Sequence, residues 1–248
     1  MSPLHPLTED AFLGGRLRLR QPAEGYRAAI DPVLLAAAVP ARDGEAVADL
    51  GCGAAAAALC LLTRVPGLRV TGLELQALLA DLARKNADLN GCAGQFRVVS
   101  GDVAAPPVAM VPGGFDHVML NPPYLEPGST RTSTHELRRI ATVEGAAGLE
   151  SWLSCAMTLL RPRGSITVIH RADRLDRILG ALAEACGDLT VFPLWPHAGE
   201  GAKRVLVQAL KGSGGPLRVL PGLVLHDAEG CYTPAAEAVL RDAAGLAL

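Results

Sequence analysis

The chain has 248 residues, of which 50% are hydrophobic and 4% aromatic, and its formal net charge at pH 7 is −2. This length is enough to bury a full core in one decorated domain, and the charge balance does not indicate a strongly basic nucleic-acid-binding protein. The longest uninterrupted apolar run, residues 54–62, is far shorter than a membrane span, and residues 1–10 contain no apolar signal core. We therefore expect a cytoplasmic protein without a membrane partner.

Strands and helices are expected to alternate along most of the chain. A short strand over 15–21 and a helix over 31–39 precede seven core strands, at 46–50, 69–74, 96–100, 115–120, 164–170, 189–195 and 203–210. The intervening helices are expected at 54–64, 76–90, 148–160 and 172–185. This order predicts an α/β fold with a mostly parallel seven-stranded sheet and helices on both faces.

Three regions follow from this order. Residues 1–42 form an N-terminal strand and helix extension, and residues 43–211 form the core. The glycine-rich stretch 211–216 is a flexible joint. Beyond it, residues 212–248 are expected to add a strand over 217–225 and a helix after Thr233.

The six cysteines show neither a Cys-x-x-Cys pair nor the spacing of a metal site. They stand at positions 52, 60, 92, 155, 186 and 231. We expect reduced, mostly buried thiols and no bound metal.

A glycine loop follows the first core strand. Residues 47–53 (Val-Ala-Asp-Leu-Gly-Cys-Gly) predict a strand that runs into a turn at Gly51 and Gly53, with a helix after it. Glycines let a ligand approach the backbone closely, and the N-terminus of the helix presents free N–H groups to an anion. The same pattern also fits a dinucleotide-binding fingerprint.

Two acidic residues stand at the ends of the next strands. Glu74 ends the strand 69–74, where its carboxylate can accept from both hydroxyls of a ribose. Asp102 follows the strand 96–100 in a comparable position. Neither residue separates a pocket for adenosylmethionine from one for NAD.

The most informative motif is Asn-Pro-Pro-Tyr at residues 121–124, directly after the strand 115–120. Prolines cannot donate to a sheet, so the strand ends abruptly at the edge where open α/β sheets bind ligands. Asn121 and Pro122 offer an amide oxygen and a fixed carbonyl, and Tyr124 offers an aromatic face. Together these groups can hold a planar amino group.

This motif resembles the catalytic motif of S-adenosylmethionine-dependent methyltransferases that act on exocyclic or amide nitrogens. Over nearly its whole length the chain is similar to the bacterial group that methylates N6 of an adenine in the tRNA anticodon loop. The supporting stretches are the glycine loop, residues 25–27 (Gly-Tyr-Arg), residues 31–35 (Asp-Pro-Val-Leu-Leu) and residues 232–233 (Tyr-Thr).

The resemblance implies a Rossmann-like class I methyltransferase fold with S-adenosylmethionine as cofactor. It implies that the loop binds the methionine carboxylate, that Asp49 lies near the ammonium group, and that Asp102 meets the adenine. Ala55 stands where the family usually has a third glycine. The implied catalytic residues are Asn121, Pro122 and Tyr124, and the implied cofactor-binding residues are Asp49, Gly51, Gly53, Glu74, Asp102 and Asn121.

The implied partner is an RNA, most simply tRNA. Arginines gather in the N-terminal strand and in the polar loop 125–145, on either side of the expected active-site mouth. That loop is a candidate substrate lid. The residues expected to contact phosphates are Arg131, Arg138, Arg139, Arg16 and Arg18.

Other functions stay open at this point. A protein glutamine N-methyltransferase would present the same planar nitrogen to Asn121. An NAD-dependent oxidoreductase is compatible with the glycine loop and Glu74, although it leaves the Asn-Pro-Pro-Tyr motif unexplained and no Tyr-x-x-x-Lys pair is present. A non-catalytic binding domain would not need the motif.

Overall fold

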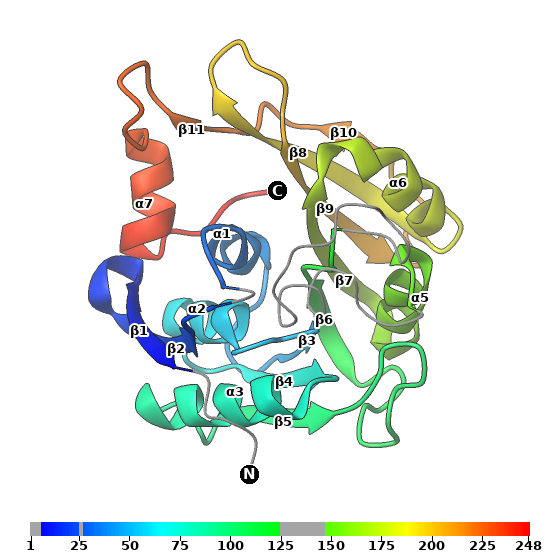
Figure 1. Cartoon of the computed structure of the whole chain (residues 1–248). Coiled ribbons are helices and arrows are strands. Elements are labelled where there is room, and N and C mark those ends of the chain that lie inside the picture. Colours follow the sequence, from blue (N-terminus) through cyan, green and yellow to red (C-terminus); the bar gives the residue numbers. More distant parts are fainter. Residues whose placement is uncertain (1–5, 25–26, 125–146) are drawn as a thin grey trace.

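The structure, a computed structural model, describes residues 6–24, 27–124 and 147–248. A nine-stranded sheet lies at its centre (Figure 1), in the order β10-β8-β9-β7-β6-β3-β4-β5, with β11 also paired to β8. β9 is antiparallel to β7 and β8, and the remaining pairs are parallel. The strands are β3 (Ala46–Leu50), β4 (Arg69–Glu74), β5 (Phe96–Ser100), β6 (Phe115–Leu120), β7 (Leu160–Arg171), β8 (Cys186–His197), β9 (Arg204–Lys211), β10 (Arg218–Val219) and β11 (Leu223–His226).

The mostly parallel sheet is confirmed, but the expected number of seven strands is too low. The seven core strands all form, and β10 and β11 extend the sheet beyond β8. A single strand was expected over 217–225. It is split because Pro221 interrupts the ladder and Gly222 turns the chain at φ +82°. A Cβ on Gly222 would lie 2.1 Å from the carbonyl oxygen of Pro193, so no other residue fits there without a shift of the backbone.

Helices cover both faces of the sheet, as expected. α1 (Asp31–Ala38), α2 (Ala56–Arg64) and α3 (Ala77–Leu89) pack on one face, together with α7 (Pro234–Asp242). α5 (Leu149–Leu159) and α6 (Leu175–Ala183) pack on the other, which is the right-hand side in Figure 1. The central strands therefore bury both of their faces. Alternate residues of β6, Met119 on one side and Val118 and Leu120 on the other, belong to the two cores.

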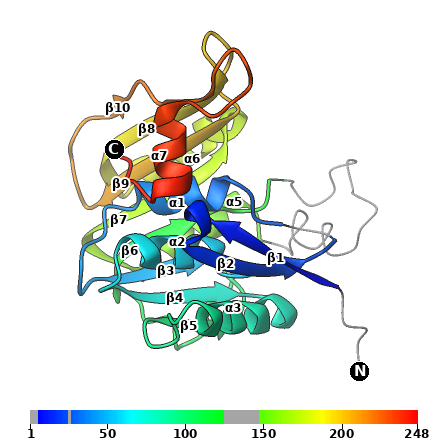
Figure 2. The ribbon, with the colours of Figure 1, turned by 90° about the vertical axis from the view of Figure 1, so that its left-hand side faces the viewer.

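An N-terminal hairpin lies outside this sheet. β1 (Leu7–Phe12) pairs antiparallel with β2 (Leu17–Pro22) through a short turn, η1 (Leu13–Gly15), and Figure 2 shows the hairpin beside α2 and α3. Only the second strand was expected. β1 has no buried residue, and its carboxylates instead receive basic side chains: Arg20 donates to Glu9 at 3.1 Å, and Arg27 donates to Asp10 at 2.6 Å. Because ion pairs and not buried side chains hold β1, its sequence lacks the hydrophobic alternation that would predict a strand.

Three further findings concern the whole of the described chain. Within residues 6–24, 27–124 and 147–248, no helix combines the length and apolar character needed to cross a bilayer. The same residues contain no cluster of three or more His, Cys, Asp or Glu side chains that could share a metal ion. The six cysteines are free thiols.

Candidate functional site

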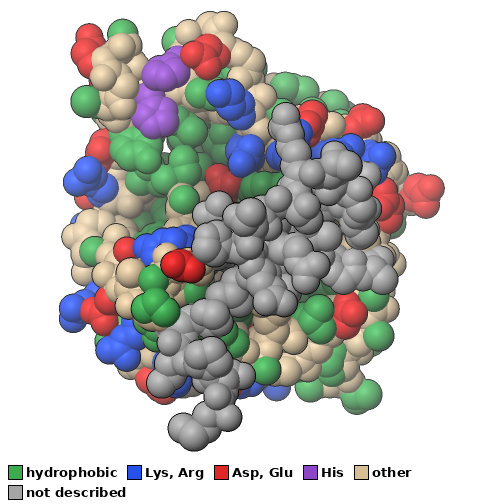
Figure 3. Space-filling view, in the orientation of Figure 1, with side chains coloured by type: hydrophobic (Ala, Val, Ile, Leu, Met, Phe, Trp, Pro, Cys, Tyr) green, Lys and Arg blue, Asp and Glu red, His purple; other side chains and the backbone are tan. Residues whose placement is uncertain are grey.

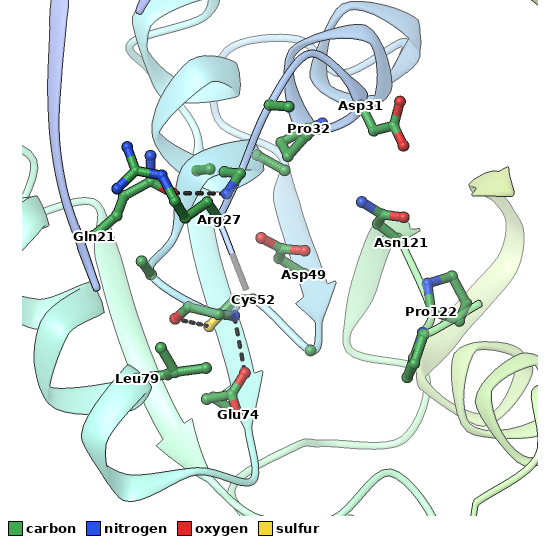
Figure 4. Close-up of a pocket in the computed structure, with 18 of the residues that line it drawn as sticks. Gln21, Arg27, Asp31, Pro32, Asp49, Cys52, Glu74, Leu79, Asn121 and Pro122 are labelled. Atoms are coloured by element: carbon green, nitrogen blue, oxygen red, sulfur yellow. Dashed lines mark hydrogen bonds between the residues drawn. The ribbon is translucent and has the colours of Figure 1, made fainter. Parts of the chain in front are cut away.

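A cavity of about 310 Å³ opens at the carboxyl ends of β3, β4 and β6. Because these strands are parallel and adjacent, the residues that follow them meet at one edge of the sheet. Figure 4 shows the cavity running from Glu74, past Asp49, to Asn121 and Asp31. Its volume suits a small-molecule ligand. The walls come from the hairpin end, the start of α1, the glycine loop, the end of β4, the Asn-Pro-Pro-Tyr motif, Trp152 and Arg204.

The glycine loop is folded for close approach. Gly51 has φ +66°, and a Cβ there would lie 2.5 Å from the Trp152 ring, so the position requires glycine. Ala55 also adopts the left-handed conformation, φ +71°, which costs an L-residue about 1–2 kcal/mol. This kink delays the start of α2 to Ala56, two residues later than expected. The Ala55 side chain is fully buried and forms no part of the cavity wall, so its methyl group does not narrow the cavity.

Asp49 is a buried carboxyl group without a full set of partners. The residue is 3% exposed, and its Oδ2 atom has no hydrogen-bond partner in the described structure. Burial, together with the nearby Glu74 carboxylate, raises the pKa of Asp49 to about 8. An unpaired acceptor on a cavity wall is costly unless a ligand supplies a donor. Asp49 therefore marks a position suited to a cationic ligand group.

Glu74 organises the loop as well as lining the cavity. Its two carboxylate oxygens accept from the backbone N–H groups of Gly53 and Gln76, both at 2.8 Å. Burial raises the pKa of this carboxyl group, and the two hydrogen bonds oppose that shift. Each oxygen keeps a further lone pair. Glu74 can thus hold the loop and still accept from a ligand.

The Asn-Pro-Pro-Tyr motif lines the opposite end of the cavity. The Tyr124 hydroxyl donates a short hydrogen bond to Asp31 Oδ2 and lies 3.0 Å from Asn121 Oδ1. The Arg204 guanidinium lies over the Tyr124 ring, 4.5 Å from its centroid, and its Nε lies 3.2 Å from the same Asp31 oxygen. Burial and the Asp31 carboxylate raise the pKa of Tyr124, so the hydroxyl keeps its proton.

Several residues of this end were not expected from the sequence. His170, at the end of β7, contacts the Tyr124 ring edge to face, with 5.2 Å between the centroids. Burial lowers the pKa of His170 to about 4, so the imidazole is neutral near pH 7. His170 is a polar residue near the carboxyl end of its strand, as Glu74 and Asn121 are, whereas Arg204 begins β9 and reaches the same edge because β9 is antiparallel. Asp31 and Trp152 stand at helix starts and carry no such signal.

Not every expected site residue reaches the cavity. Asp102 lines a small adjacent hollow with Gly51 and Trp152, rather than the main cavity. Arg16 donates to backbone carbonyls of Leu13 and Arg241, and Arg18 pairs with Glu9 at 2.5 Å. The cavity wall instead receives Arg27 and Arg204. Three more expected residues lie outside the described ones: Arg131, Arg138 and Arg139.

Known proteins similar in sequence to this chain include methyltransferases of two kinds. A release factor glutamine methyltransferase from Chlorobaculum tepidum is 31% identical over 166 residues, which are 64% of this chain and 56% of that protein. A tRNA1(Val) (adenine(37)-N6)-methyltransferase from Porphyromonas gingivalis is 28% identical over 236 residues, 91% of each chain. One from a second strain of that species is 30% identical and covers 75% of this chain and 74% of its own. These relatives confirm the resemblance that the motifs indicated.

Solved structures support the same fold. A predicted O-methyltransferase from Agrobacterium tumefaciens is 27% identical, with a TM-score of 0.73 over 88% of this chain and 99% of its own. A geranyl diphosphate C-methyltransferase from Streptomyces coelicolor is 16% identical, with a TM-score of 0.53 over 73% and 76%, a likeness of fold alone. The methyltransferase small domain family matches residues 30–186, more than half of the sequence. The chain belongs to the methyltransferase small domain family.

Proposed function

We propose that this protein is an S-adenosylmethionine-dependent N-methyltransferase that modifies the N6 amino group of an adenine in tRNA. The observation that carries the proposal is that one cavity combines two buried carboxyl groups with the amide of the Asn-Pro-Pro-Tyr motif. The buried Glu74 and Asp49 carboxyl groups line its first part, and the Asn121 amide lies beyond them, beside Tyr124. Such a substrate would place the enzyme in the cytoplasm.

The residues at the first end fit adenosylmethionine. Asp49 would accept from the ammonium group, which provides the hydrogen-bond donor that its buried Oδ2 lacks. Glu74 would accept from the ribose hydroxyls with its remaining lone pairs. The N-terminus of α2 would receive the carboxylate. Asp102 borders a small hollow that adjoins the cavity at Gly51, and from there its carboxylate would accept from the adenine amino group.

The residues at the second end fit a planar amino group. Adenosylmethionine supplies a methyl group on an electrophilic sulfonium. Asn121 and the Pro122 carbonyl would accept from the amino group and hold its nitrogen in line with that methyl group. A base stacked on Tyr124 would use the ring face opposite Arg204. A loop base suits this site because extruding it costs less than opening a duplex pair.

The choice of tRNA rests on the extent of the similarity. The tRNA methyltransferase of Porphyromonas gingivalis matches this chain over 91% of both lengths, whereas this chain covers only 56% of the glutamine methyltransferase. The charge distribution adds little support for tRNA as the substrate, because basic and acidic side chains are interspersed on the described part of the face in Figure 3. We assign phosphate contacts to Arg131, Arg138 and Arg139, and to Arg16 and Arg18 after they exchange their present partners.

A labelling experiment tests the acceptor. The purified protein is incubated with methyl-labelled adenosylmethionine and, in separate reactions, with unmodified total tRNA and with protein extract, with Asn121→Ala as the inactive control. We expect label in tRNA as N6-methyladenine. Label in protein glutamine, and none in tRNA, would contradict this proposal and indicate a protein glutamine methyltransferase.

Replacing Glu74 by alanine tests the cofactor end. We expect cofactor binding to weaken by about 1–3 kcal/mol, because charge-assisted hydrogen bonds are lost. Calorimetry with adenosylmethionine measures this, and thermal unfolding separates it from damage to the glycine loop. Glu45→Ala is the matched control, because Glu45 contacts His117 at the opposite edge of the sheet. Unchanged affinity in folded Glu74→Ala protein would remove Glu74 from the site.

A further inference from the structure

The hydrogen bonds around the Tyr124 hydroxyl contain one proton too few. The hydroxyl lies within hydrogen-bond distance of two acceptor atoms, Asp31 Oδ2 and Asn121 Oδ1. A phenol carries one proton, and a carboxylate carries none. The proton goes to Asp31, because this bond is the shorter one and its acceptor is charged. The Tyr124 oxygen then faces the Asn121 oxygen at 3.0 Å with no proton between them.

Rotating the Asn121 amide by half a turn removes this conflict. The two ends of the amide exchange places, and Nδ2 then donates to the Tyr124 oxygen across the same 3.0 Å. Figure 4 shows which atom this moves into the cavity: the Asn121 nitrogen lies on the side of Asp49, and the oxygen lies on the other side. After the rotation, the acceptor faces the cavity.

We propose that Asp31 is a positioning residue that acts through the Tyr124 hydroxyl to hold the Asn121 amide with its oxygen toward the substrate nitrogen. The proposal rests on the proposed function, which needs an acceptor there. Asp31 takes the hydroxyl proton, so the hydroxyl can only accept from Asn121, and the amide has one favoured orientation. Arg204, 3.2 Å from Asp31 and stacked on Tyr124, holds both partners in place.

Without Asp31, the hydroxyl would turn its proton to Asn121. The amide would then favour its other orientation, with the oxygen bound to Tyr124 and the nitrogen facing the substrate amino group. Two donors would oppose each other where an acceptor is required. Asp31→Ala should therefore lower kcat by about tenfold, the order expected for one misdirected hydrogen bond, while leaving cofactor affinity unchanged.

The decisive variant is the double substitution Asp31→Ala with Tyr124→Phe. Phenylalanine keeps the ring but has no hydroxyl to hold the amide in the wrong orientation. We expect the double variant to turn over several-fold faster than Asp31→Ala alone. If Asp31 only supported the fold, the second substitution would slow the enzyme further or leave it unchanged, and that result would overturn the proposal. Asp81→Ala and Tyr232→Phe, both outside the cavity, are the matched controls.

Neutron diffraction of the unliganded protein tests the same proposal without any substrate, because nitrogen, oxygen and deuterium scatter neutrons differently. We expect a deuteron between Tyr124 and Asp31, and Asn121 Nδ2 facing the Tyr124 oxygen. A deuteron on the line from Tyr124 to Asn121 Oδ1 would overturn the proposal. Kinetics are measured with whichever acceptor the wild type methylates. If it labels neither tRNA nor protein, the proposed function fails, and the neutron map still decides the role of Asp31.

Discussion

Replacing Asn121 by alanine is expected to lower turnover by roughly 100-fold or more, as removal of a key positioning group in an active site does. An amide does not titrate near neutral pH, so Asn121 cannot remove a proton from the substrate. Its contribution is to accept a hydrogen bond and align the nitrogen, and both are lost with the side chain. Cofactor binding should persist, because the substitution leaves the Asp49 and Glu74 carboxyl groups in place.

Single-turnover assays with labelled cofactor measure the chemical step, and calorimetry measures cofactor binding. Asn90→Ala provides the matched control. The Asn90 amide accepts from the Arg18 N–H at 2.9 Å and donates to the Arg18 carbonyl at 2.7 Å, so it binds the backbone of the hairpin and does not line the cavity. Near wild-type turnover in Asn121→Ala would exclude the mechanism. So would a loss of cofactor binding large enough to explain the whole defect.

The strand-end rule explains why much of the site could be predicted. Asp49, Glu74 and Asn121 stand in or directly after apolar runs that form adjacent parallel strands. Parallel neighbours bring their carboxyl ends to one edge, so three residues far apart in the chain were expected together and all line one cavity. The fold followed from the same alternation of strands and helices.

The surroundings of Tyr124 could not be predicted in this way. Asp31 is 93 residues from Tyr124 and 173 residues from Arg204, and no local pattern links them. Their meeting depends on how α1 packs against the sheet and where β9 begins. The present partners of Arg16 and Arg18 could not be predicted either. The local cluster of arginines predicts a substrate surface, and in the structure the hairpin and α7 supply carboxylates and carbonyls that engage both side chains.

Replacing Asp49 by asparagine is expected to stabilise the unliganded protein at neutral pH. Burial raises the pKa of Asp49 from 3.8 to about 8, so the folded state holds a proton that the unfolded chain releases. The folded state therefore loses stability as the pH rises from about 4 to about 8, by about 1.4 kcal/mol per pH unit at most. Asparagine has no proton to release, so the free energy of unfolding of the variant should rise relative to that of the wild type by a few kcal/mol over that range.

Urea unfolding of both proteins at about pH 5 and about pH 8 measures this difference, with Asp81→Asn on the exposed side of α3 as the control. An advantage for Asp49→Asn that does not grow between about pH 5 and about pH 8 would show that Asp49 is already ionised in the unliganded protein.

The same substitution is expected to weaken adenosylmethionine binding by about 10- to 100-fold, because the neutral amide cannot pair with the ammonium group. Wild-type binding should also depend on pH. Below about pH 8 the ammonium must displace the proton on Asp49, so affinity should fall by nearly tenfold per pH unit between about pH 7 and about pH 6. Asp49→Asn should lack this dependence, which calorimetry at several pH values would show. A cationic ligand explains why a carboxyl group that destabilises the unliganded fold stands at the cavity wall. If the wild type and Asp49→Asn bound adenosylmethionine equally well at all pH values, this explanation would fail.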